Sequence, residues 1–138
     1  MKLLLDTCTI AEFSKPFPDQ KVIAFIESAP SESLFLSAIS VGEISKGIHL
    51  LGPTKRRAEL QQWLMQLEQS YQDHIFPINI DVSRIWGEIT AEAQKKGKIL
   101  PAADGLIAAT AINYGLHLVT RNVKDFDCSS ALLINPWV

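Results

Sequence analysis

Long apolar runs, cysteines and glycine-rich loops are all scarce in this chain of 138 residues. No apolar run approaches the length of a transmembrane helix, and the three leucines of residues 3–5 stop at Asp6, too early for a secretory signal. The two cysteines, Cys8 and Cys128, lack zinc-ligand spacing and give no disulfide framework. Neither a Walker loop nor a G-x-G-x-x-G motif is present. We therefore expect a reduced cytoplasmic protein with no membrane span.

The chain also lacks an excess of positive charge. Its formal net charge is −2, so the molecule as a whole does not attract nucleic acid. Any contact with nucleic acid has to be local, through a basic patch or a bound cation. The length suits one domain over residues 1–138, and the 47% hydrophobic content leaves room for a buried partner surface.

Short apolar runs alternate with longer segments of helical period. Residues 19–29, 54–71 and 81–96 repeat their apolar positions at helical spacing, and Gly-Pro pairs or isolated prolines separate them from their neighbours. The expected strands are Lys2–Asp6, Ser33–Ser37, His74–Ile78, Leu116–Thr120 and Leu132–Asn135. This alternation predicts an α/β fold with a central, mainly parallel five-stranded sheet and helices on both faces.

Three acidic residues lie near the junctions between a predicted strand and a predicted helix: Asp6, Glu43 and Asp104. A fourth polar position, Asn122, follows another strand and is trailed by Asp125. The carboxyl ends of parallel strands share one edge of the sheet, where such sheets bind ligands. Crowded carboxylates repel one another and normally need a metal ion to stay ionised. Oxygen-only ligands favour Mg²⁺, with Mn²⁺ as a substitute, and hence phosphate chemistry.

Helix capping offers an alternative for each acid taken alone. Asp6 has the position of an N-cap, Glu43 completes an S-x-x-E capping box begun by Ser40, and Asp104 lies in the first turn of a helix. Asn122 also has cap spacing. Capping does not explain why all the acids fall at one edge of the sheet, nor why small residues surround Asp104 and let its helix approach the strands. The set as a whole favours a metal site.

The chain resembles the PIN-domain ribonucleases, especially the VapC-type toxins of bacterial type II toxin–antitoxin pairs. The matching text is LLLDT, VGEISKGI and PAADGLIAATAINYGLHLVTRNVKDF, and the resemblance covers essentially the whole chain. It implies a PIN-like fold, Mg²⁺-dependent endoribonuclease activity, a homodimer, and inhibition by a small cognate antitoxin. Asp6, Glu43 and Asp104 match the family's metal-binding acids, and Asn122 falls on its fourth position.

Two positions depart from the family pattern. The fourth position is acidic in many members, so the neutral Asn122 implies a weaker second ion or a contribution from Asp125. Cys8 replaces the usual Asn or Ser, and we interpret it as a small filler, because hydrolysis by an activated water needs no covalent nucleophile. The alternative function is a PIN-fold module that binds RNA or antitoxin with weak or no catalysis.

Two basic segments could contact RNA phosphates. Lys95, Lys96 and Lys98 precede the helix that carries Asp104, and Arg121 flanks the fourth position, so these four residues are the predicted substrate-binding cations. Helix-dipole complementation is the competing explanation for the lysines.

The second basic segment, residues 55–57, places three cations at a helix start, where they oppose the dipole. It suggests a substrate rim or an acidic partner, unless Glu59 offsets the charge. The same helix carries an apolar stripe that we assign to the core rather than to an antitoxin or dimer surface: Trp63, Leu64, Leu67 and Tyr71.

Overall fold

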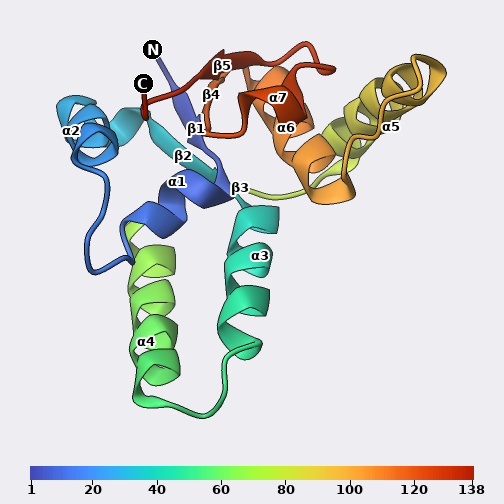
Figure 1. Ribbon diagram of the computed structural model, residues 1–138. Coiled ribbons are helices and arrows are strands. Elements are labelled where there is room, and N and C mark those ends of the chain that lie inside the picture. The colour runs from blue at the N-terminus through green and yellow to red at the C-terminus, as the bar shows by residue number, and fades with distance from the viewer.

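A computed structural model describes residues 1–138 and contains one five-stranded sheet whose neighbouring strands all run parallel (Figure 1). The strand order is β3-β2-β1-β4-β5, which places the first strand of the chain at the centre. The strands are β1 Leu3–Leu5, β2 Leu34–Ser37, β3 Ile75–Phe76, β4 His117–Val119 and β5 Leu132–Ile134. Each predicted strand is therefore present, shorter than predicted at one or both ends, and the predicted α/β fold is confirmed.

Seven α-helices and one 3₁₀ turn connect the strands. Their ends follow local rules: Asp19, Thr54 and Asn79 accept backbone N–H groups as N-caps, and Gly115 ends a helix with φ +66°. The helices are α1 Thr7–Glu12, α2 Gln20–Ser28, α3 Ala38–His49, α4 Lys55–Ser70, α5 Ile80–Lys95, α6 Ala102–Tyr114 and α7 Val123–Phe126, with the 3₁₀ turn η1 at Ser31–Ser33.

The sheet separates two apolar cores, as alternation along the strands requires. Leu3 and Leu5 point into a core shared with helices α1 to α4, whereas Leu4, between them, joins a second core against α6 and α7. Small side chains at Ala108 and Ala111 let α6 pack closely on this second face. Helices therefore cover both faces, as predicted.

The helices α3 and α4 pack against each other as a hairpin that projects away from the sheet (Figure 1). On the other side of the molecule, α5 packs along α6. A tight contact fixes that pair: a Cβ added at Gly105 would lie 2.8 Å from Cδ1 of Trp86. No helix of the protein combines the length and apolar character needed to cross a membrane.

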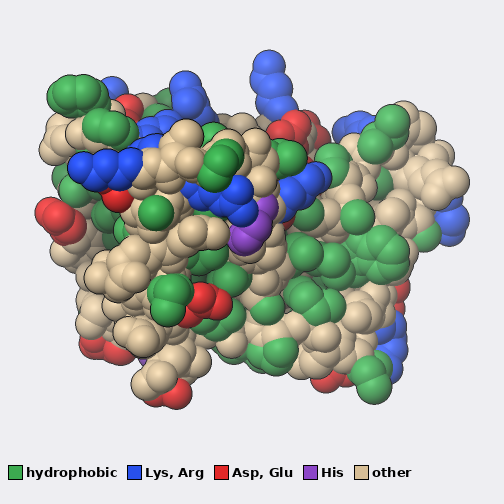
Figure 2. Space-filling view, turned by 90° about the horizontal axis from the view of Figure 1, so that it is seen from below, with side chains coloured by type: hydrophobic (Ala, Val, Ile, Leu, Met, Phe, Trp, Pro, Cys, Tyr) green, Lys and Arg blue, Asp and Glu red, His purple; other side chains and the backbone are tan.

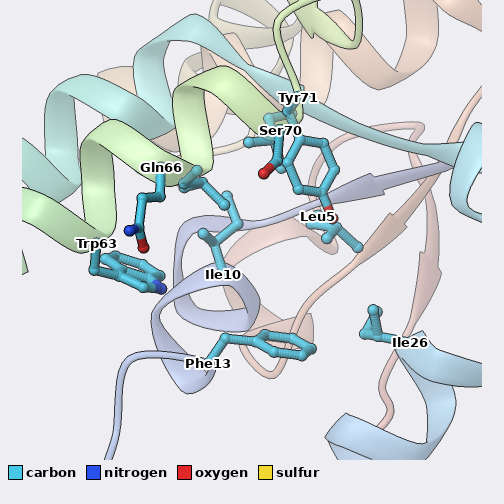
Figure 3. Close-up of a pocket in the computed structure, with 10 residues that line it drawn as sticks. Leu5, Ile10, Phe13, Ile26, Trp63, Gln66, Ser70 and Tyr71 are labelled. Carbon is cyan, nitrogen blue, oxygen red and sulfur yellow. The ribbon is translucent and has the colours of Figure 1, made fainter.

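The apolar stripe of α4 is only partly core. Leu64 is buried, at 9% exposure, but Trp63, Leu67 and Tyr71 are half-buried. Together with Ile10 they line an apolar groove of about 290 Å³ between α4, α1 and α2, shown in Figure 3. Packing accounts for one face of these side chains and leaves the other face open to the groove.

Candidate functional site

Asp6 directly follows β1 and is buried at the carboxyl edge of the sheet, with 4% of its surface exposed. One carboxylate oxygen, Oδ1, accepts the backbone N–H of Thr7 at 2.8 Å, so Asp6 does cap α1. The other oxygen accepts the Thr120 hydroxyl at 2.7 Å and the Cys8 thiol at 3.3 Å. These three donors fix the orientation of the carboxylate. Asp6 can therefore cap α1 and also take part in a functional site.

Thr120 is fully buried and had no place in the sequence-based site. The register pairs Leu5 with Val119, so the next residues of β1 and β4, Asp6 and Thr120, stand side by side. Besides donating to Asp6, the Thr120 hydroxyl accepts the backbone N–H of Asn122 at 3.0 Å. Thr120 thus ties the fourth position to the first acid.

Glu43 lies on the second turn of α3 and is held by Thr7, whose hydroxyl donates to Oε1 at 2.6 Å. The Thr7 and Ser40 hydroxyl oxygens are 3.0 Å apart. The capping-box interpretation of Glu43 is wrong, because α3 begins at Ala38 with Ser37 as its N-cap and Ser40 lies inside the helix. Glu43 therefore needs another explanation, and its Oε2 makes no hydrogen bond.

Asp104 lies in the first turn of α6, as predicted, and its carboxylate makes no hydrogen bond or ion pair. Partial burial, followed by the charges of Asp6, Glu43 and Asp125, raises the pKa of Asp104 to about 6. Burial likewise raises the pKa of Asp6, opposed by the hydrogen bond from Thr120. The three predicted acids are therefore close enough to repel one another.

The fourth position, Asn122, is less constrained than the buried, hydrogen-bonded Asp6. Asn122 is exposed, stands at the N-cap of α7 and makes no side-chain cap hydrogen bond. Asp125, one turn later, contributes to the raised pKa of Asp104, which places its charge near the other acids. Cys8 beside them is kept as a neutral thiol, since burial and the Asp6 charge raise its pKa.

The chemistry of this donor set fits a hard divalent cation. Asp6, Glu43, Asp104 and Asp125 supply oxygen only, and no lysine or arginine pairs with any of them. Their mutual repulsion is the condition that a cation relieves. In this structure, however, no group of three or more His, Cys, Asp or Glu is arranged so that it could hold a metal ion.

The predicted substrate-binding cations lie in two places. Arg121 directly follows Thr120, and its guanidinium carbon lies 5.8 Å from the ring centre of Trp137. Lys95, Lys96 and Lys98 lie at the end of α5 and in the loop before α6, where Lys95 pairs with Glu92 at 3.7 Å. The other two lysines line a polar hollow that also contains acidic residues: Glu88, Glu92 and Asp127.

The fold, with acids from three segments at one edge of a parallel sheet, is that of a PIN domain. The sequence model of the PIN domain matches residues 3–127, and this chain belongs to that family.

Two relatives are similar over nearly their whole length. One is the VapC ribonuclease Y4jK of Sinorhizobium fredii, 36% identical over 136 residues, which cover 98% of this chain and 97% of that protein. The other is the toxin FitB of Neisseria gonorrhoeae, 37% identical over 139 residues that cover 98% of each chain. A crystal structure of FitAcB from Neisseria gonorrhoeae superposes with a TM-score of 0.91 at 36% identity, covering 98% of both chains. These comparisons confirm the resemblance drawn from the motifs.

Proposed function

We propose that this protein is a Mg²⁺-dependent endoribonuclease and the toxin of a toxin–antitoxin pair. The observation that carries the proposal is the convergence of Asp6, Glu43 and Asp104 at one sheet edge. Thr7 donates hydrogen bonds to both Asp6 and Glu43, and burial, followed by the charges of these two acids, raises the pKa of Asp104 to about 6. The two relatives, a VapC ribonuclease and a toxin, agree with it.

In this proposal Asp6, Glu43 and Asp104 hold the ion, with Mn²⁺ as a substitute. When bound, the ion would supply the positive charge that activates a water and neutralises a phosphate. The Thr120 and Cys8 donors keep the Asp6 carboxylate in one orientation, and Thr7 does the same for Glu43. Asp104, which lacks a hydrogen bond, is free to ligate. We assign the fourth position to Asp125 in preference to Asn122, because only Asp125 adds charge near Asp104.

Asp104→Asn is the direct test. The amide keeps the size of the side chain but removes the charge that holds the ion, so Mg²⁺-dependent RNA cleavage should disappear while the fold remains. Cleavage sites are mapped in cellular RNA after inducing the wild type and the variant, and hydrolysis by an activated water predicts 5′-phosphate and 3′-hydroxyl ends. Asp73→Asn is the matched control, since Asp73 is exposed and makes no ion pair. Wild-type cleavage by the Asp104 variant would rule out the site.

The alternative, a PIN-fold module without efficient chemistry, is favoured by the amide at Asn122 and by the absence of a closed ligand set. Calorimetry with Mn²⁺ separates the two functions. Failure to bind Mn²⁺ at millimolar concentration would favour the module, whereas binding that Asp104→Asn removes would favour the nuclease.

The proposed partner is a small antitoxin, encoded by a short reading frame directly upstream. Two of the solved relatives are VapBC proteins bound to DNA: VapBC2 from Rickettsia felis and VapBC from Salmonella typhimurium. The first superposes with a TM-score of 0.82 at 25% identity. The groove beside Trp63 and Tyr71 offers an apolar partner segment a place to bind, so we now favour the partner-surface alternative for the exposed side of that stripe (Figure 3). A homodimer remains part of the proposal.

A further inference from the structure

The turn that joins α3 to α4 is strongly basic in an acidic protein. Residues 44–58, which we call the basic hairpin, contain Lys46, Lys55, Arg56 and Arg57 and no acidic residue. The whole chain has a net charge of −2, so these four positive charges leave −6 on the rest. The charge of the basic hairpin is therefore opposite to that of the remaining chain.

These cations are accessible and largely uncompensated. Lys46 and Lys55 are exposed and make no hydrogen bond or ion pair. Arg56 has one acidic neighbour, Glu59, at 3.9 Å, and its side chain is 47% exposed. Figure 2 views the molecule from the side toward which the hairpin projects and shows several Lys and Arg side chains on this face.

A structural role explains only part of this charge. Arg56 donates to the Ser14 carbonyl at 2.7 Å, and Arg57 donates to the Leu51 carbonyl at 3.4 Å, so both arginines fasten chain segments. Carbonyl groups do not neutralise a guanidinium, and cations at the start of α4 oppose its dipole. Lys46 and Lys55 make no hydrogen bond or ion pair that would hold chain segments together. Folding therefore does not explain the positive charge of the basic hairpin, which indicates a role in binding.

The predicted lysines near α6 are a weaker phosphate site. Lys95 pairs with Glu92, and Lys96 and Lys98 share their hollow with Glu92 and Asp127. Their neighbouring acids offset their charge. The basic hairpin is flanked by acids only at its two ends, Glu43 and Glu59, and of these only Glu59 forms an ion pair, with Arg56.

The basic hairpin is also connected to the acids at the sheet edge. Glu43 and Lys46 are three residues apart on α3 and so lie on the same side of that helix. The helix leads from the acids to the tip of the hairpin, where Lys55 begins α4. A strand of RNA held at the acids can therefore run along α3 and bring its next phosphates to the hairpin.

We propose that the basic hairpin binds the phosphate backbone of the RNA substrate beside the cleavage site. This inference rests on the proposed function for the identity of the ligand. An acidic, repelling site in a protein of net charge −2 needs a local source of attraction for a polyanion, and the hairpin supplies it.

The test compares two double variants with the same loss of charge. Lys46→Gln/Lys55→Gln removes the two lysines of the basic hairpin that have no polar partner, which spares the fold. Lys95→Gln/Lys96→Gln removes the same charge from the competing phosphate site at the end of α5. Binding of a labelled single-stranded RNA of about 30 nucleotides is measured in EDTA, without cleavage, over a series of salt concentrations. The slope of log K against log salt is negative, and the loss of two phosphate contacts should reduce its magnitude by about 1.4. At about 0.1 M salt the affinity should fall roughly 25-fold, with little change near 1 M.

Two further outcomes separate this inference from the nuclease proposal. With Mg²⁺, the hairpin variant should cleave the long RNA poorly and an oligonucleotide of about six residues normally, whereas Asp104→Asn should cleave neither. If the wild type binds RNA in EDTA in a salt-dependent way but cleaves none with Mg²⁺, the nuclease proposal is wrong and the hairpin site is still supported. The inference is overturned if the wild type shows no salt-dependent RNA binding, or if the slope is unchanged or falls equally in both double variants. Loss of antitoxin binding with RNA binding intact would likewise overturn it and make the hairpin a protein surface.

Discussion

Removing the Asp104 charge should stabilise the metal-free protein even though it disables the site. In the folded protein the carboxylate is partly buried and faces the charges of Asp6, Glu43 and Asp125, which raise its pKa from 3.8 to about 6. A rise of this size corresponds to about 3 kcal/mol at 1.36 kcal/mol per pKa unit. Because Asp104 is partly exposed, solvent screening reduces the expected gain for Asp104→Asn to about 1 kcal/mol, or about 4 °C in Tm.

The gain depends on pH in a definite direction. The pKa of Asp104 in the fold lies above its unfolded value, so the folded protein holds the proton more tightly than the unfolded chain does. The free energy of unfolding of the wild type therefore falls as the pH rises from about 4 through 6, whereas an amide has no such titration. The difference between the variant and the wild type should be largest above about pH 7 and should vanish near pH 4.

Urea unfolding at about pH 7.5 and pH 4.5, in EDTA and in Mn²⁺, measures this difference. In EDTA at the higher pH the variant should be the more stable protein, and in Mn²⁺ the order should reverse, because only the wild type gains from binding the ion. A variant that is no more stable than the wild type in EDTA, or equally more stable at both pH values, would refute the repulsion among the acids.

Two further substitutions test the supports of the site. Thr120→Val keeps the shape but removes the 2.7 Å donor to Asp6, so it should cost about 1.5–3 kcal/mol of stability and weaken Mn²⁺ binding roughly 10- to 100-fold by calorimetry. Thr120→Ser should restore both, and unchanged Mn²⁺ affinity in the valine variant would show that Thr120 does not orient Asp6. Gly105→Ala places a Cβ 2.8 Å from Trp86 and should cost about 1–3 kcal/mol in urea unfolding. Trp86→Leu in the same chain should recover part of that loss, and strictly additive losses would contradict the contact.

The fold could be predicted from sequence because its signals are local. Apolar runs bounded by turn residues predict the strands, and the rule for carboxyl edges predicts that Asp6, Glu43 and Asp104 lie together. Helix starts were less certain: Ser37 and Ser40 are both good N-cap residues, and only packing selects Ser37. The capping-box assignment of Glu43 failed for that reason.

Other parts of the site require the register of distant strands. The bond from Thr120 to Asp6 joins residues 114 positions apart, and no local pattern sets that pairing. Arg56 likewise conflicts with the dipole of its own helix, and its tether to Ser14 appears only in three dimensions. The metal and the roles of the acids stay predictions, because they concern a bound ion rather than the fold.

The distance along the chain between Asp6 and Thr120 also bears on synthesis. Asp6 leaves the ribosome 114 residues before Thr120, but its fixed orientation depends on the Thr120 hydroxyl, at the junction between β4 and α7. Contacts this far apart in sequence form late in folding, since a long loop must close first. The nascent chain therefore cannot complete the site until Thr120 has been synthesised, and any chain truncated before residue 120 would lack it.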